Sequence, residues 1–394
     1  MQLSRIHNKQ RTVIKMKNFS KILCVVLALV IALSATSCSL SPQYAYQQDD
    51  IELPIGVYIY YLFNAYNSAQ GYAQKSDLYD AETGKYDGKK SFLKMEITDD
   101  DGETAVAEDW IKNKADEDTK NAVAINTKFN ELGCTIDQTE LDSTKTYYKS
   151  YWDQSYAEQL EPYGISFDSF FLAGYTIPVM ETEAFKAEYG TDGPSAVSDE
   201  ELTDYFKENY TSYKYFSVNL YETAETDSAD GSEETASENT PLSEDKIAEY
   251  QKDFSDYAST LSDGGSYADV VAEYMEKYEV EEDPTTENVE DIDEETTDDI
   301  LKTIKDMKDG QAMTMEVGED ENSKQLYLIY REPIEKQVEA YTDPEQHKND
   351  VLSAMKHDAF DELLKDLADE QKITLSSACS SYNPSMFEET NKKK

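Results

Sequence analysis

Apolar positions recur with a helical period through the first half of the chain. Ile51 to Tyr72 is an aromatic, alanine-rich segment that predicts the first helix, and residues 105–115 predict another. Within residues 119–132, apolar side chains at i, i+4 and i+7 form one stripe, and Gly133 ends it. This spacing is typical of amphipathic helices that bury one face.

Residues that begin helices punctuate the same region. Asp137 and Ser198 are each followed three residues later by a glutamate, which is the spacing of a capping box. The second of these predicts a helix over residues 199–209. Ser166 predicts one more helix start, and Pro178 predicts a kink or break soon after it.

The period changes in the second half, where residues 214–221 alternate like a strand. The segment that follows reads β-α-α-α-β-β. Two acidic stretches, 223–242 and 279–297, predict disordered loops. A long amphipathic helix over residues 344–370 has no sequence neighbour, so we expect it to pack on the N-terminal helices. The other predicted helices span 244–261, 267–278 and 298–308, and the other predicted strands span 311–317 and 324–331.

The N-terminus has the layout of a bacterial lipoprotein signal. A basic start precedes an apolar run from Ile22 to Ala35, which is too short to span a bilayer, and small residues then lead to Cys38. We expect residues 1–37 to be a signal peptide, Cys38 to carry the lipid, and residues 38–50 to form a tether. The alternative is an ordinary secretory signal with an incidental cysteine. Translation from Met1 or from Met16 is left open.

Charge excludes several classes of partner. The chain has 36 Lys and Arg against 82 Asp and Glu, a formal net charge of −46. Such a surface repels phosphate backbones and anionic headgroups, so nucleic acid is not an expected partner and only the lipid would hold the protein at the membrane. The expected location is the extracytoplasmic face of the cell membrane.

Candidate chemistry is sparse. Cys134 and Cys379 lack metal-site spacing, and either one long-range disulfide or two unpaired thiols fits the sequence. The two histidines beyond the predicted signal peptide, His347 and His357, lie on one predicted helix, so no nucleophile–His–acid set is available. We expect no catalytic residues, no metal and no cofactor.

Several motifs, taken in order, resemble one family. Besides the signal that ends at Cys38, residues 132–137 (LGCTID), 197–206 (VSDEELTDYF) and 371–375 (QKITL) resemble the PrsA-type foldase lipoproteins, relatives of the SurA-type chaperones. In that family the first of these three motifs is a helix junction, the second enters an isomerase module, and the third is a closing strand.

The resemblance implies an α+β fold that is mostly α. A helical chaperone domain would be discontinuous, with a parvulin-like (PpiC) prolyl isomerase module inserted into it. The implied boundaries are 51–211 plus 337–380 for the helical domain, 212–336 for the module, and 381–394 for a tail.

The module departs from the family where its chemistry would lie. Val218 on the first strand and Tyr327 on the last strand occupy the places of two family histidines. Acidic residues 279–297 replace a glycine-rich loop. We therefore interpret the module as degenerate, with little or no isomerase activity.

The expected function is transient binding of unfolded exported polypeptides by a membrane-anchored chaperone. The residues expected to line an open apolar cradle are Tyr60, Phe63, Tyr148, Tyr151 and Trp152, although each of them also fits ordinary core packing. A homodimer is one oligomeric state that the sequence leaves open. The alternatives are an active peptidyl-prolyl isomerase of the parvulin class and a solute-binding lipoprotein.

Overall fold

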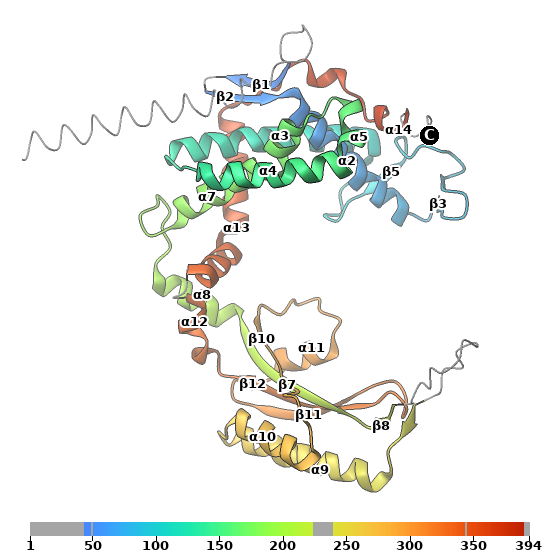
Figure 1. The fold of residues 1–394 in the computed structure, drawn as a ribbon, viewed down its shortest axis with the longest axis vertical. Coiled ribbons are helices and arrows are strands. Elements are labelled where there is room, and N and C mark those ends of the chain that lie inside the picture. The colour runs from blue at the N-terminus through green and yellow to red at the C-terminus, as the bar shows by residue number, and fades with distance from the viewer. Residues whose placement is uncertain (1–42, 49, 224–238, 343–344, 390–394) are drawn as a thin grey trace, which may run out of the picture. The chain divides into compact units, whose positions relative to one another are not determined.

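A computed structural model describes residues 43–48, 50–223, 239–342 and 345–389 (Figure 1). The chain is α+β and mostly helical, and it divides into two compact units. Unit 1 runs to Ala196 and resumes at His357, and unit 2 is Val197–Lys356. The predicted signal segment and Cys38 lie outside the described residues. Within the described parts, no helix is long and apolar enough to cross a membrane.

Unit 1 is built around two long helices that pack on each other, α2 and α3. The predicted helices 105–115 and 119–132 are one helix, because the residues between them continue the turn without a proline or glycine. An N-terminal hairpin precedes α2, and two small hairpins connect α2 to α3. These elements are β1 (Tyr44–Gln48), β2 (Ile51–Pro54), α2 (Ile55–Lys75), β3 (Tyr79–Asp80), β4 (Lys85–Tyr86), β5 (Glu96–Thr98), β6 (Thr104–Val106) and α3 (Ala107–Glu131).

Short helices then fold back over α2 and α3, and local caps fix where they begin. The Asp137 carboxylate accepts the backbone N–H groups of Thr139 and Glu140 at 2.7 and 3.1 Å, and the Ser166 hydroxyl accepts that of Ser169 at 3.2 Å. The break expected near Pro178 is a π-helical turn, η2. These elements are α4 (Gln138–Ser155), α5 (Ala157–Leu160), η1 (Glu161–Tyr163), α6 (Phe167–Phe171), η2 (Leu172–Thr176) and α7 (Ile177–Tyr189).

The C-terminal part of the chain completes unit 1. Phe360, in the second half of α13, packs edge-on against Phe185 of α7 with ring centroids 5.4 Å apart. Residues 371–375 form no strand, contrary to the family motif. Instead the chain reaches β1 at one point, where Ser376 N–H donates to the Ala45 carbonyl at 2.8 Å. The elements here are α13 (Glu345–Glu370), η4 (Cys379–Ser381) and α14 (Met386–Glu389).

Unit 2 contains a four-stranded antiparallel sheet in the order β10-β7-β12-β11. Helices α9 and α10 cover one face and α11 covers the other (Figure 1). The remaining helices and short strands of unit 2 precede, connect or follow these strands along the chain. The elements are α8 (Asp199–Asn209), β7 (Thr211–Asn219), β8 (Tyr221–Glu222), β9 (Thr240–Pro241), α9 (Glu244–Ser262), α10 (Tyr267–Tyr278), β10 (Thr286–Glu290), α11 (Asp299–Asp306), β11 (Ala312–Val317), β12 (Gln325–Glu332), η3 (Ile334–Lys336) and α12 (Val338–Thr342).

Two expectations for this unit are corrected. The acidic stretch 279–297 contains strand β10, because backbone pairing with β7 satisfies its N–H and C=O groups whatever its side chains. The unit also begins at 197 and ends at 356, not at 212 and 336. Phe206 of α8 stacks on Tyr341 of α12 at 5.2 Å, which joins these two flanking helices within unit 2. Of the other acidic stretch, residues 224–238 lie outside the described residues, and β9 near its end pairs with β8, which comes just before it.

Candidate functional site

Unit 1 contains an aromatic pocket of about 370 Å³. One helix face supplies part of its wall, because Tyr60, Phe63 and Asn64 of α2 follow the i, i+3, i+4 spacing that places side chains side by side. The remaining wall comes from α4 and its C-cap, α5, α6 and η2. The lining residues are Tyr60, Phe63, Asn64, Tyr148, Tyr156, Gln159, Leu160, Phe170 and Gly174.

Two features fix the position of the Tyr60 ring in this wall. Phe170 meets Tyr60 edge-on, with centroids 5.6 Å apart and planes at 90°. Gly174, in the π-helical turn, faces the same tyrosine: a Cβ at this position would come within 3.2 Å of the Tyr60 hydroxyl oxygen. The absence of a side chain at residue 174 therefore keeps room beside the Tyr60 ring.

Three of the five predicted cradle residues line this pocket, namely Tyr60, Phe63 and Tyr148. The other two lie elsewhere. Tyr151 is 53% exposed and packs beside a lining tyrosine, and Trp152 is 1% exposed. Trp152 packs against the Phe170 ring at 5.0 Å, so it supports the wall from behind and does not line the pocket.

Sequence reasoning missed Tyr156, Leu160, Phe170 and Gly174 as lining residues. The available signal is the cluster of aromatic residues after the Ser166 cap, which by itself predicts only a helix. Its role depends on the fold, because the pocket forms only when α6 packs on α2 and α4 packs on α6.

The pocket lining carries no Asp, Glu, Lys or Arg, in a chain of formal charge −46. Its polar groups are the amides of Asn64 and Gln159 and the tyrosine hydroxyls. Burial, followed by the effect of Tyr151, raises the pKa of Tyr156, which keeps that hydroxyl neutral. Such a surface accepts apolar side chains and offers amides to a peptide backbone, but it supplies no acid or base that titrates near neutral pH.

The two positions that the resemblance assigns to histidine, Val218 and Tyr327, lie on opposite faces of the unit 2 sheet. Val218 is opposite Leu326 in the strand register, and Tyr327 is opposite Ser217. Directly paired residues share a face, and neighbours along a strand alternate. Val218 accordingly packs with the core under α9 and α10, whereas Tyr327 packs with the core under α11. The two side chains therefore do not form one site.

The α11 face is rich in tyrosine and methionine. Tyr327 donates a hydrogen bond to Gln325 Oε1 at 2.6 Å, and its ring lies 5.9 Å from that of Tyr215. Burial raises the pKa of Tyr327, so the phenol stays protonated. The hydrophobic side chains of this face are Tyr213, Tyr215, Ile292, Ile300, Leu301, Ile304, Met307, Met313, Met315, Tyr327 and Ile329.

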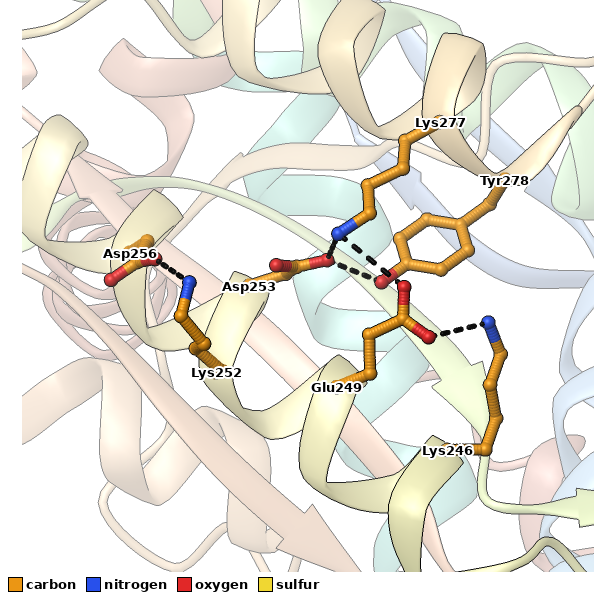
Figure 2. Close-up of polar contacts among 7 residues, drawn as sticks. All are labelled: Lys246, Glu249, Lys252, Asp253, Asp256, Lys277 and Tyr278. Carbon is orange, nitrogen blue, oxygen red and sulfur yellow. Dashed lines mark hydrogen bonds and ion pairs between the residues drawn. The ribbon is translucent and has the colours of Figure 1, made fainter.

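A polar network fastens α10 to α9 (Figure 2). Lys277 and Tyr278 both donate to the Asp253 carboxylate, and Lys277 also lies 3.5 Å from Glu249. Burial opposes ionisation of Asp253, but the hydrogen bonds from Lys277 and Tyr278 outweigh it and lower the pKa of Asp253. The carboxylate is thus held ionised and partnered, which is a structural arrangement and leaves no free base.

Within the described ranges, Cys134 and Cys379 are free thiols. Burial raises the pKa of Cys379 to about 11 and also raises that of Cys134. Neither is therefore a ready thiolate nucleophile. No group of three or more His, Cys, Asp or Glu side chains is placed to hold a metal ion in the parts of the chain that the structure describes.

Comparison with solved structures gives a weak likeness, whereas the other two comparisons find nothing. No family model matches the chain, and no curated protein matches it. The chain is similar to the crystal structure of the foldase protein PrsA from Streptococcus pneumoniae str. Canada MDR_19A, at 14% sequence identity and a TM-score of 0.32. That likeness covers 73% of this chain and 97% of the other.

Proposed function

We propose that this protein is a lipid-anchored extracytoplasmic chaperone that transiently holds unfolded exported polypeptides and has little or no prolyl isomerase activity. The observation that carries the proposal is the aromatic pocket of unit 1, whose lining bears no charged side chain. Apolar side chains of an unfolded chain fit such a pocket, whereas folded, polar surfaces do not.

The pocket favours weak binding, as a holding chaperone requires. Full burial of one Phe or Leu side chain contributes about 1.5–3 kcal/mol. Since each 1.4 kcal/mol is a factor of about ten in affinity, one anchor raises binding roughly ten- to a hundredfold. The amides of Asn64 and Gln159 add hydrogen bonds that depend little on client sequence. A client held in this way leaves again quickly.

The arrangement of unit 2 supports the second half of the proposal. The family resemblance places one histidine on the first strand of the module and one on the last. Here the corresponding strands, β7 and β12, do pair, but they carry Val218 and Tyr327 on opposite faces. An isomerase must favour a twisted prolyl amide over a planar one, across a barrier of about 20 kcal/mol. Neither position offers the paired donors and acceptors for that task.

The test compares two neighbouring tyrosines of α4. Tyr148 lines the pocket, and Tyr147 beside it is 72% exposed and lies outside the lining. We expect Tyr148→Ala to weaken suppression of aggregation of an unfolded client severalfold, and Tyr147→Ala to leave it within error. In the same preparation, X–Pro isomerisation in a short peptide should stay near its uncatalysed time of tens of seconds.

Three results would contradict the proposal. Equal loss in both variants would show that the pocket does not hold clients. A fast, saturable isomerisation rate would favour the active isomerase. Tight binding of a small solute that protects unit 1 against thermal unfolding, without any holding of polypeptide, would favour a solute-binding protein.

A further inference from the structure

The C-terminal segment 383–389 inserts one aromatic side chain into unit 1. Phe387 is 2% exposed, and its ring lies 5.3 Å from Phe63, 5.3 Å from Tyr66 and 4.8 Å from Tyr163. We call these three rings the Phe387 socket. The sequence placed residues 381–394 outside the domain as a tail, and the structure corrects this for residues 381–389.

The segment is attached in the way that a bound peptide is attached. Its backbone bonds are mainly internal, with Met386 N–H donating to Asn383 at 3.0 Å and Phe387 N–H donating to Pro384 at 3.1 Å. Two bonds reach the rest of unit 1: the Asn383 amide donates to Glu108 Oε1 at 2.8 Å, and the Tyr163 hydroxyl donates to the Phe387 carbonyl at 3.4 Å. A single helical turn such as α14 has no stability of its own, so the Phe387 anchor holds it.

The socket and the client pocket share one side chain. Phe63 lines the pocket, and the same ring forms one wall of the socket. Withdrawal of Phe387 would therefore expose the rings of Tyr66 and Tyr163 next to the pocket and lengthen the apolar surface available to a client. The three walls of the socket are aromatic rings.

We propose that the socket is a second client subsite, which takes an aromatic side chain of an unfolded polypeptide, and that the C-terminal segment of this chain occupies it when no client is bound. The proposal rests on the proposed holding function. The chain's own sequence shows the kind of occupant that fits: a short, proline-containing stretch with one phenylalanine anchor. A resident segment that fills the site nine-tenths of the time lowers the apparent affinity of a competitor about tenfold.

The experiment uses the chain without its predicted signal peptide and a variant that ends at Tyr382. The probe is a fluorescent peptide with the sequence of residues 380–390, and the control peptide carries Phe387→Ala. We expect the shortened protein to bind the probe about tenfold more tightly than the full chain does. It should bind the control peptide poorly, and it should suppress client aggregation better than the full chain.

A second variant, Phe387→Ala in the full chain, removes the anchor and empties the socket without shortening the chain. It should also gain affinity for the probe. If either variant unfolds, or if both fold but fail to bind the probe, the segment is a fixed part of the core and the inference is wrong. If the probe binds but suppression of client aggregation does not improve, the socket serves only this chain and is not a client subsite. Because these measurements leave Tyr148 intact, they can fail while the pocket still holds clients.

Discussion

At the residue scale, close packing around the pocket depends on one glycine. Gly56, in the first turn of α2, faces α6, where a Cβ would come within 2.9 Å of the Ser169 Cβ and 3.2 Å of the Gly164 carbonyl oxygen. Ser169 is buried, so its side chain has little room to move. The start of α2 can therefore approach α6 only without a side chain at residue 56, and this approach sets the position of Tyr60 one turn later.

We expect Gly56→Ala to destabilise unit 1 by about 1–3 kcal/mol, since overpacking forces neighbours off their preferred conformations. The matched control is Gly71→Ala in the same helix, where no atom lies within 4 Å of the added Cβ. That change should stabilise the helix by about 0.5–1 kcal/mol, because alanine loses less backbone entropy. Thermal or urea unfolding of both variants measures the difference, and equal stabilities would contradict the close contact.

At the element scale, helices pack through buried apolar contacts and through a few hydrogen bonds and ion pairs. In unit 2, α9 and α10 share the core beneath the sheet, with Phe216 of β7 packed between Phe254 and Tyr274 at 5.3 and 4.7 Å. The Asp253 network lies at the rim of this core (Figure 2). The contacts between the rings are hydrophobic and set no orientation, whereas the hydrogen bonds to the Asp253 carboxylate fix the orientation of α10 relative to α9.

Substitution of two aspartates of α9 tests the role of the Asp253 network. Asp253 is buried against Lys277 and Tyr278 of α10, and Asp256 pairs with Lys252 at 2.9 Å on the exposed face of α9 (Figure 2). We expect Asp253→Asn to destabilise unit 2 by about 1–3 kcal/mol, because charge-assisted bonds are lost and Lys277 keeps only its longer contact with Glu249. Asp256→Asn should change stability by less than about 1 kcal/mol. Similar losses in the two variants would contradict the structural role of the network.

The pH dependence has a definite sign. The folded-state pKa of Asp253 is lowered, so its contribution is present above the unfolded-state pKa and is lost as the pH falls through the folded value. Acid unfolding of the natural chain should therefore lose this contribution below about pH 4, near the ordinary aspartate pKa. The Asp253→Asn variant should show a shallower loss over that range.

At the scale of the whole molecule, the chain leaves unit 1 after Ala196 and returns at His357. Unit 1 therefore includes residues at both ends of the chain, and its core holds Phe360 and Leu364 of α13, together with Phe387. The proposed membrane attachment also concerns the whole molecule. The lipid at Cys38 would hold the protein at a membrane whose anionic headgroups repel its acidic surface.

We expect Cys38→Ala to move the protein from the membrane fraction to the soluble fraction, because the thiol that would carry the lipid is gone. Cys134→Ala is the control, since that cysteine lies within unit 1, and it should leave the protein with the membrane. Cell fractionation followed by immunoblotting measures both. Equal membrane association of the natural chain and Cys38→Ala would contradict the anchor.

The sequence by itself determined the local features. The capping box at Ser198 is present as predicted, with both of its hydrogen bonds, and α10 spans the predicted residues 267–278. Ser243 and Ser266 also cap their helices, each accepting a backbone N–H from the residue three positions on. These features follow from contacts between residues a few positions apart, so a short stretch of sequence contains all the groups that decide them.

Tertiary structure decided the rest. Strand β10 forms in an acidic stretch because β7 is there to pair with it, and the faces of Val218 and Tyr327 follow from a register in which a shift of one residue reverses the side. The pocket beside Tyr60 and the Phe387 socket join rings that are far apart in the sequence. A local pattern indicates which face of an element is buried, but it does not identify the partner that covers that face, because distant elements supply the partner only when they pack.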